Sequence, residues 1–234
     1  MKLGIIGAMT VEVEMLKSML TDAMQTQRAG IEFCSGKLQG LDVVIAQCGV
    51  GKVNAALCVQ IMCDVFSVTG IVNTGVAGSL DPQLNIGDLV VSRDAMYHDF
   101  DCHSLNPDYP VGQVPGMAVH AYPADDALIC CALSAAEEAP GKVWLGRIAS
   151  GDQFVCDSEV KKKIIADTGA CCTEMEGAAI AHAAWRNGVP FVVIRAISDK
   201  ADNSAEMDYP TFEAIAAKQC AAVTARMAKA VANQ

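Results

Sequence analysis

Carboxylates stand where buried strands are expected to give way to polar segments. Glu12 follows the apolar segment LGIIGAM near the N-terminus, and Asp199 follows the apolar run FVVIRAI at 191–197. In open α/β sheets, ligands bind beyond the carboxyl ends of the strands. A carboxyl group there is partly desolvated, which raises its pKa and lets it hold a proton near neutral pH. Asp199 is therefore a candidate acid or, equally, the N-cap of the next element.

The same residues also have plain structural interpretations. Glu12 falls in the first turn of an expected helix, where the helix macrodipole stabilises an acid, and taken alone this interpretation is favoured. Glu14 points to another face of that helix, so the two acids do not form a pair. Arg195 lies inside an apolar strand and must be paired if it is buried. The acids available to it are Glu12, Glu174 and Glu176, so we expect a charged cluster below a cleft.

The elements that must position these residues alternate between strands and helices. Apolar runs predict strands over 2–7, 31–38, 42–48, 70–76, 89–91, 143–149 and 191–197. Helical spacing predicts a helix capped by Thr10, and further helices over about 52–65, 125–138, 157–166, 175–187 (ended by Gly188) and 209–232. A long loop is expected from Tyr97 to Ala124. This order predicts a single α/β domain over 1–234.

Two segments have residue types that bind ions elsewhere. A Gly-rich turn expected at 75–79 could cradle a phosphate, whereas Gly4-x-x-Gly7 falls short of the dinucleotide-binding pattern. His98, Asp99, Asp101, Cys102 and His103 have no spacing that matches a zinc template, so we interpret them as a polar loop. We therefore predict no metal and no cofactor.

Composition excludes several classes of partner. The net charge of −10 and the lack of a basic cluster beyond Lys161–Lys163 argue against binding to nucleic acid or to anionic lipid. No apolar stretch approaches the ~18 residues of a membrane helix, and no signal peptide is recognisable. The eleven cysteines include no C-x-x-C pair. We expect them to be reduced, buried residues of a cytoplasmic protein.

Five segments, taken in order, carry a family resemblance. They are GIIGAM at 4–9, NTGVAGSL at 73–80, SGDQFV at 150–155, TEMEGAAIAH at 173–182 and RAISD at 195–199. The chain resembles the 5′-methylthioadenosine/S-adenosylhomocysteine nucleosidases of the purine and uridine phosphorylase superfamily. The resemblance implies a three-layer α/β/α fold with a central mixed, partly barrel-like sheet. It also implies a hydrolase of methionine salvage that releases adenine from methylthioadenosine and S-adenosylhomocysteine.

The resemblance also implies roles for the matching residues. Asp199 would protonate N7 of adenine, Glu12 would take a proton from the attacking water, and Glu176 would accept hydrogen bonds from the ribose hydroxyls. Adenine would stack on Phe154, meet the Val155 backbone at its Watson–Crick edge and lie close to Ala77 and Gly78. Met9, Val50 and Met175 would form an apolar wall. Ser198 and Arg195 would orient the acids. A homodimer is expected, in which the partner's loop at about 102–115 completes the 5′ pocket and the helix at 52–65 is a candidate interface.

Three alternatives stay open at this point. A phosphorylase needs cations around its phosphate, and here the first loop has no Arg or Lys before Lys17. Asn73 and Val76 add no positive charge, and Val76 stands where the family more often has serine. The loop at 102–115 is less aromatic than the family pattern, which keeps another hydrolase, such as one for futalosine, in consideration. A nucleoside sensor without turnover is the third alternative.

Overall fold

A mixed sheet of ten strands forms the centre of the computed structural model, which describes residues 1–233. The strands are β1 (Lys2–Gly7), β2 (Thr21–Arg28), β3 (Ile31–Leu38), β4 (Leu41–Gln47), β5 (Gly70–Ser79), β6 (Leu89–Tyr97), β7 (Ala121–Pro123), β8 (Val143–Ser150), β9 (Cys172–Glu174) and β10 (Phe191–Asp199). They follow the order β10-β6-β8-β9-β5-β1-β4-β3-β2, and β7 pairs with β6. Because β10 also pairs with β5, five strands close into a ring, as the predicted barrel-like sheet requires.

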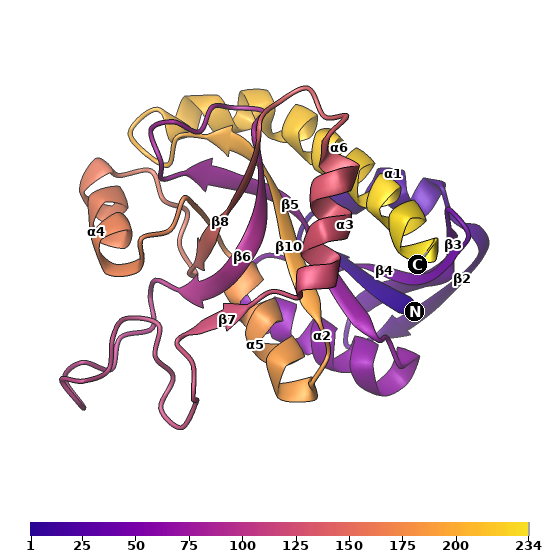
Figure 1. Cartoon of the computed structure of the whole chain (residues 1–234), viewed down its shortest axis with the longest axis horizontal. Helices are drawn as coiled ribbons and strands as arrows, with labels where there is room; N and C mark the ends of the chain where they lie inside the picture. Colours follow the sequence, from indigo (N-terminus) through magenta and orange to yellow (C-terminus); the bar gives the residue numbers. More distant parts are fainter. Residues whose placement is uncertain (234) are drawn as a thin grey trace.

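Helices cover both faces of this sheet. They are α1 (Thr10–Ser18), α2 (Lys52–Phe66), α3 (Asp126–Ala136), α4 (Ser158–Thr168), α5 (Gly177–Asn187) and α6 (Ala205–Ala232). In Figure 1, α1, α3 and α6 lie on one side of the sheet and α2 and α5 on the other, in agreement with the contacts between these helices. The predicted three layers are therefore confirmed.

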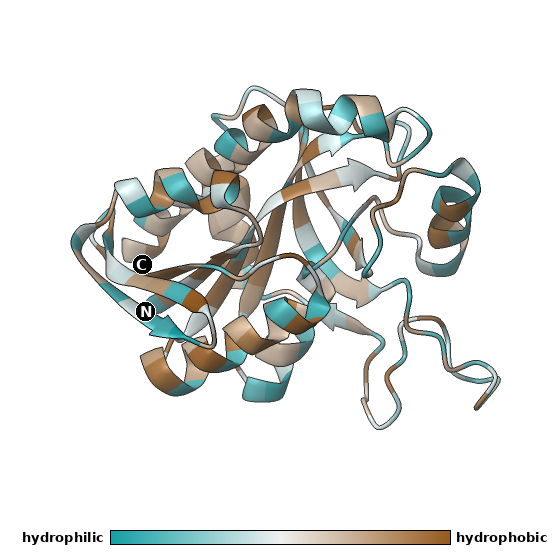
Figure 2. Ribbon diagram, turned by 180° about the vertical axis from the view of Figure 1, so that it is seen from behind, coloured by the Kyte–Doolittle hydropathy of each residue, from teal (hydrophilic) through white to brown (hydrophobic). Residues whose placement is uncertain are grey.

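The core sits in the middle strands of the sheet. Every residue of β5 and β10 is buried, as expected for strands with helices on both faces. Figure 2 shows the central strands coloured mostly as apolar and the outward faces of the helices as mixed. The parallel register of β5 and β10 sets Arg195 beside Gly75, and after a bulge it sets Asp199 beside Gly78. The carboxyl ends of these strands are thereby brought together.

Some predicted boundaries were wrong, for physical reasons that the structure gives. The segment Gly75–Ser79 is not a turn, because β5 continues through it to pair with β9 and β10. Met9, not Thr10, is the N-cap of α1. The exposed edge strand β2 was missed because its sequence TDAMQTQR has no buried apolar face. The three-residue strand β9 was not predicted. Helix α5 begins at Gly177, two residues after the predicted start, and ends before left-handed Gly188, as predicted.

The long loop predicted from Tyr97 to Ala124 is shorter in the structure, because β6 extends through Tyr97 and the unpredicted strand β7 occupies 121–123. It extends away from the sheet in Figure 1. The eleven cysteines, all within residues 1–233, form no disulfide. Within residues 1–233, none of the helices has the length and apolar character needed to cross a membrane.

Candidate active site

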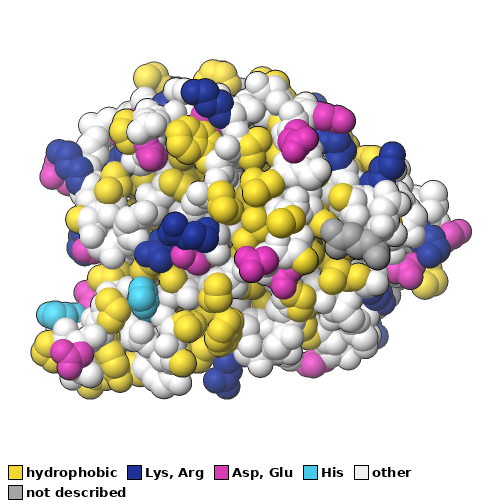
Figure 3. All heavy atoms as spheres, viewed as in Figure 1, with side chains coloured by type: hydrophobic (Ala, Val, Ile, Leu, Met, Phe, Trp, Pro, Cys, Tyr) yellow, Lys and Arg dark blue, Asp and Glu magenta, His cyan; other side chains and the backbone are white. Residues whose placement is uncertain are grey.

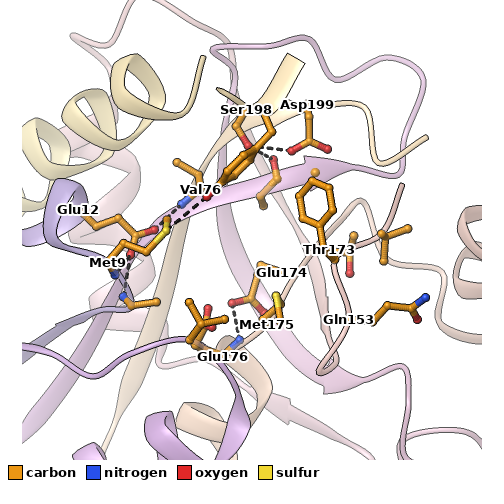
Figure 4. A pocket seen from close by; sticks show the side chains of 17 residues that line it. Met9, Glu12, Val76, Gln153, Thr173, Glu174, Met175, Glu176, Ser198 and Asp199 are labelled. Carbon is orange, nitrogen blue, oxygen red and sulfur yellow. Dashed lines mark hydrogen bonds between the residues drawn. The ribbon is translucent and has the colours of Figure 1, made fainter. Parts of the chain in front are cut away.

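A cavity opens where β1, β5 and β10 end, and it extends to β9 and the start of α5. It is lined by Ala8, Met9, Glu12, Val50, Val76, Ala77, Gly78, Gln153, Phe154, Val155, Thr173, Glu174, Met175, Glu176, Ser198, Asp199 and Tyr209. All the site residues predicted from the sequence line it, apart from Arg195. In Figure 4, Glu12 and Asp199 lie on opposite sides of the cavity.

Glu12 faces the cavity from the first turn of α1. Its Oε2 accepts hydrogen bonds from the amides of Ala8 (2.7 Å) and Met9 (2.9 Å), and its Oε1 accepts one from the Val76 amide (3.1 Å). Burial raises the pKa of this carboxyl, while the charge of Arg195 and the three amide bonds oppose the shift. Glu12 therefore accepts hydrogen bonds at the N-terminus of α1, in keeping with its structural interpretation as an acid in the first turn. It also presents a buried carboxyl group to the cavity.

Arg195 lies below the cavity and neutralises its acids. Its side chain is 1% exposed and forms an ion pair with Glu174. Nη2 also donates to Asn73 Oδ1 (2.6 Å) and lies 3.7 Å from Glu176 Oε2. This is the charged cluster that the sequence predicted, and it explains how an arginine is tolerated inside an apolar strand. Burial and the neighbouring charge of Glu174 raise the pKa of Glu176 to about 7.

Glu174 organises the turn that carries Glu176. Its carboxylate accepts hydrogen bonds from the amides of Glu176 (3.0 Å) and Gly177 (2.8 Å) and from the hydroxyl of Ser150. The Gly51 amide at the start of α2 donates to Glu176 Oε1 (2.8 Å). Glu176 is thus held from two sides while it faces the cavity. Glu174 was expected only as a partner of Arg195, because nothing in the sequence shows that it also lines the cavity.

Asp199 is buried at the end of β10. Ser198 Oγ donates to its Oδ2 (2.9 Å) and the Ala201 amide to its Oδ1 (2.8 Å). Burial raises the pKa of the carboxyl, and the two hydrogen bonds oppose that shift. A β-carbon on Gly78 would lie 2.7 Å from Asp199 Oδ1, so only glycine fits beside the acid. A carboxyl group in this setting is suited to donate a proton near neutral pH.

Two aromatic rings stand at the mouth of the cavity. Phe154 meets Tyr209 edge to face, with 5.4 Å between ring centroids, and the Tyr209 hydroxyl donates to Met9 Sδ (3.3 Å). Sequence reasoning missed Tyr209, which belongs to α6 far along the chain. It also missed Gln153 and Thr173 as lining residues, since no motif reports which face of a short element is turned inward.

The loop that carries Phe154 is fastened to α2. Asp152 accepts a hydrogen bond from the Lys52 amide (2.8 Å), and Asp99 accepts bonds from the Asp152 amide (2.9 Å) and from Lys52 Nζ (2.6 Å). Lys52 Nζ also lies over the Tyr97 ring, 5.4 Å from its centroid. Asp99, part of the group weighed as metal ligands, thus serves as a salt-bridge partner. Within residues 1–233, no cluster of acids, histidines and cysteines is arranged to hold a metal ion.

The charged groups that line the cavity are carboxyl groups, and its other polar side chains, Gln153, Thr173, Ser198 and Tyr209, are neutral. Among the described residues, four acids and no Lys, Arg or His line it. Such a site favours proton transfer and disfavours a phosphate dianion, because the cation nearby, Arg195, is buried below the cavity and already paired with Glu174. The apolar side chains Met9, Val50, Val76 and Met175 form the rest of the wall around these acids. The arrangement suits hydrolysis of a polar, uncharged molecule with an apolar extension.

Comparison with known proteins agrees with this geometry. Residues 2–229 match the family described as the phosphorylase superfamily. The 5′-methylthioadenosine/S-adenosylhomocysteine nucleosidase of Staphylococcus carnosus is 39% identical over 230 residues, which are 98% of this chain and 100% of that protein. The nucleosidase of Colwellia psychrerythraea, solved with adenine, is 41% identical with a TM-score of 0.93 over 97% of this chain and 94% of its own. Futalosine hydrolase of Helicobacter pylori is 33% identical, with a TM-score of 0.90 over 97% of this chain and 96% of its own.

Proposed function

The chain belongs to the 5′-methylthioadenosine/S-adenosylhomocysteine nucleosidases of the phosphorylase superfamily, and we propose how its own residues perform the reaction of that family. The reaction is hydrolysis of the N-glycosidic bond of 5′-methylthioadenosine and S-adenosylhomocysteine. Adenine leaves, and water adds to C1′ of the thioribose product. Two proton transfers accompany this exchange, one to the base and one from the water.

Asp199 is the proposed acid and Glu12 the proposed base. Asp199 donates its proton to N7 of adenine, which makes the base a better leaving group as positive charge develops on the ribose. Glu12 accepts a proton from water as the water oxygen bonds to C1′. Their placement on opposite sides of the cavity supports this assignment, because an inverting hydrolase needs its acid and base on opposite faces of the bond.

The remaining residues bind and orient the substrate. Glu176, held by Gly51 and facing Arg195, accepts hydrogen bonds from the ribose hydroxyls. Phe154 stacks on adenine, and the Val155 backbone contacts its Watson–Crick edge. Ala77 and Gly78 approach the base closely, and Ser198 orients Asp199. Met9, Val50 and Met175 cover the sugar and the 5′ thioether.

One observation carries the proposal: two buried carboxyl groups with raised pKa values face one cavity that no described cation lines. A phosphorylase would need positive charge for its phosphate, and Val76 contributes only an apolar side chain and an amide already bonded to Glu12. Futalosine hydrolysis is not favoured, since relatives at 39%, 41%, 43% and 40% identity are all 5′-methylthioadenosine/S-adenosylhomocysteine nucleosidases, whereas the futalosine hydrolase is 33% identical.

The assembly and the location are proposals that extend this function. We propose a homodimer in which the partner's loop at 102–115 completes the 5′ pocket. Apolar side chains that are exposed on a single chain support it, namely Val53 and Leu57 of α2, Val50 at the cavity and Leu105 of the loop. We also propose a cytoplasmic location, which the lack of disulfides among the eleven cysteines of the described residues supports. On the face drawn in Figure 3, acidic and basic side chains are interspersed without a continuous basic patch, which gives no support for nucleic acid as a partner of that face.

The test is release of adenine from 5′-methylthioadenosine, measured with and without inorganic phosphate. We expect adenine and 5-methylthioribose at the same rate in both conditions, with S-adenosylhomocysteine also cleaved. Phosphate-dependent turnover with formation of 5-methylthioribose 1-phosphate would mean that the chain is a phosphorylase. Preference for futalosine over both thio-nucleosides would reassign the substrate, and absence of turnover on all three would favour a sensor.

A further inference from the structure

Thr173 is a buried polar residue that the proposed mechanism does not use. It is the middle residue of β9 and pairs with Gly78 of β5 on one side and with Ala149 of β8 on the other. Its side chain lines the cavity, yet the residue is only 5% exposed. Within residues 1–233, its hydroxyl oxygen has no hydrogen-bond partner.

The other buried serine and threonine hydroxyl groups among residues 1–233 are paired, although the buried hydroxyl of Tyr122 is not. Thr168, which is also buried, donates to Ile164 O (2.6 Å) and accepts from the Ala170 amide (3.1 Å). Ser150 and Ser198 are bonded as well. A buried hydroxyl without a partner destabilises a fold, so such a group is uncommon and calls for a specific explanation. Four other buried side-chain atoms lack partners, but in the described part of the chain only Thr173 combines this property with a place in the cavity wall.

The sheet places Thr173 at the base-binding end of the cavity. Gly78 pairs with Thr173 in β9 and with Asp199 in β10, so these residues flank one glycine across three neighbouring strands. Two strand spacings amount to about 10 Å between the outer backbones. Asp199 and Thr173 both line the cavity, one on either side of Gly78, so a flat bicyclic ring bound in the cavity can present one edge to Asp199 and another to Thr173. In Figure 4, Thr173 lies on the same side of the cavity as Asp199 and away from Glu12.

We propose that Thr173 is a further substrate-binding residue, whose hydroxyl donates a hydrogen bond to a ring nitrogen, N1 or N3, of the six-membered ring of adenine. This inference rests on the proposed function, in which Asp199 donates a proton to N7 on the other edge of adenine. N1 and N3 are both acceptors, and threonine supplies a hydroxyl donor. Ser198, the other hydroxyl beside Asp199, already donates to that carboxyl. Thr173 thus contributes to binding of the base and does not take part in proton transfer.

The test compares two valine variants of similar shape. In Thr173→Val the unpaired hydroxyl becomes a methyl group, so we expect a melting temperature equal to or above that of the wild type. Adenine affinity, measured by calorimetry without turnover, should fall by about 3–10-fold, the usual effect of one neutral hydrogen bond. KM for 5′-methylthioadenosine should rise by a similar factor with little change in kcat. The control Thr168→Val loses two hydrogen bonds outside the cavity and should melt lower with unchanged adenine affinity.

Adenine analogues identify the acceptor. 1-Deazaadenine and 3-deazaadenine each lack one ring nitrogen, and for one of them Thr173→Val and the wild type should bind equally. The proposal is overturned if the variant binds adenine as the wild type does, if it loses the same affinity for adenine and both analogues, or if it melts lower as Thr168→Val does. Failure of the proposed function looks different, because the wild type itself would then release no adenine from 5′-methylthioadenosine.

Discussion

The backbone of Gly75 passes so close to Glu12 that a β-carbon on Gly75 would overlap the carboxylate oxygen Oε1. The same β-carbon would overlap the Arg195 guanidinium. The φ angle of Gly75 is not in the left-handed region, so the glycine is required by space and not by backbone conformation. The next amide, that of Val76, donates to Glu12 Oε1. Strand β5 therefore holds the proposed base with its backbone at a point where any side chain would displace the acid.

Gly75→Ala should consequently disable the enzyme. The methyl group forces Glu12 and Arg195 to move, so we expect kcat/KM for 5′-methylthioadenosine to fall by at least ~10²-fold, the lower range for loss of a positioned general base. Gly70→Ala is the matched control, because it lies on the same strand and its methyl would meet only the end of the Leu3 side chain, at 2.8 Å. Both variants should melt below the wild type. Similar loss of activity in both would show that the effect is on folding alone.

The two proposed catalytic acids can be tested one at a time. Glu12→Gln and Asp199→Asn keep the shape of each side chain but remove its ability to exchange a proton, so each should lower kcat by at least ~10²-fold with the fold intact. Glu14→Gln changes an exposed acid two residues along α1, and Asp202→Asn changes one that pairs with Lys161 outside the cavity. These controls should stay within about threefold of the wild type. Near-normal turnover in either site variant would remove that residue from the mechanism.

The sequence predicted well those features that depend on local pattern. The apolar run at 191–197 identified β10, and its lone Arg195 correctly implied buried acidic partners. Glu12 and Asp199 reached the same cavity because strand ends meet at one edge of an α/β sheet. The structural interpretation of Glu12 was not mistaken, since it also completes the α1 N-terminus. Glu12 therefore has both a structural role at the start of α1 and a place in the cavity. The structural interpretation of Asp199 was wrong, because Asp199 ends β10 and the N-cap of the next helix is Ser204.

Features that depend on distant pairing could not be predicted. The run GVAGS resembles a turn by composition, but it forms a strand because β10 and β9 supply partners on either side. Tyr209 reaches the cavity only through the path of α6, and Thr173 only through a three-residue strand too short to show a period. A sequence pattern indicates which face of a helix or strand is buried. It does not indicate where Tyr209 and Thr173 lie, because their positions depend on neighbours more than 30 residues away in the chain.

Glu176 should make stability depend on pH. Its pKa in the folded chain is about 7, above the ordinary 4.5. At a pH between these two values, the folded state therefore keeps a proton that the unfolded state has lost. Stability from this group is complete below about pH 4.5 and decreases as pH rises to about 7. In Glu176→Gln the melting temperature should therefore fall less between pH 5 and pH 8 than in the wild type. Thermal melts without ligand across this range measure the difference.

A second glutamine variant provides the control for that comparison. The pKa of Glu32 is lowered by its bond to Lys17, so its titration lies below pH 5 in both the folded and unfolded states. Glu32→Gln should shift the melting temperature by a constant amount and leave its change between pH 5 and pH 8 as in the wild type. An identical pH dependence in Glu176→Gln and the wild type would contradict a raised pKa for Glu176.

Lys52 should affect binding of the base although it does not line the cavity. Its ammonium joins Asp99 and Asp152, and through them it fixes the loop that carries Phe154 and Val155. Lys52→Met removes this charge, so the loop should stack less well on adenine. We expect KM for 5′-methylthioadenosine to rise by about 3–10-fold with kcat within about threefold, the pattern for loss of binding shared by substrate and transition state.

The matched control for Lys52 is Lys17. Both lysines form a salt bridge to one close carboxylate, at 2.6 Å and 2.9 Å, and their side chains are 22% and 21% exposed. Each pair should therefore contribute at most about 1 kcal/mol to stability, so Lys17→Met and Lys52→Met should melt within a few degrees of each other. Only Lys52→Met should change KM, and Lys52→Arg should restore most of it. Equal effects of the two methionine variants on KM would mean that the loop is positioned by its backbone alone and that the Lys52 charge is dispensable.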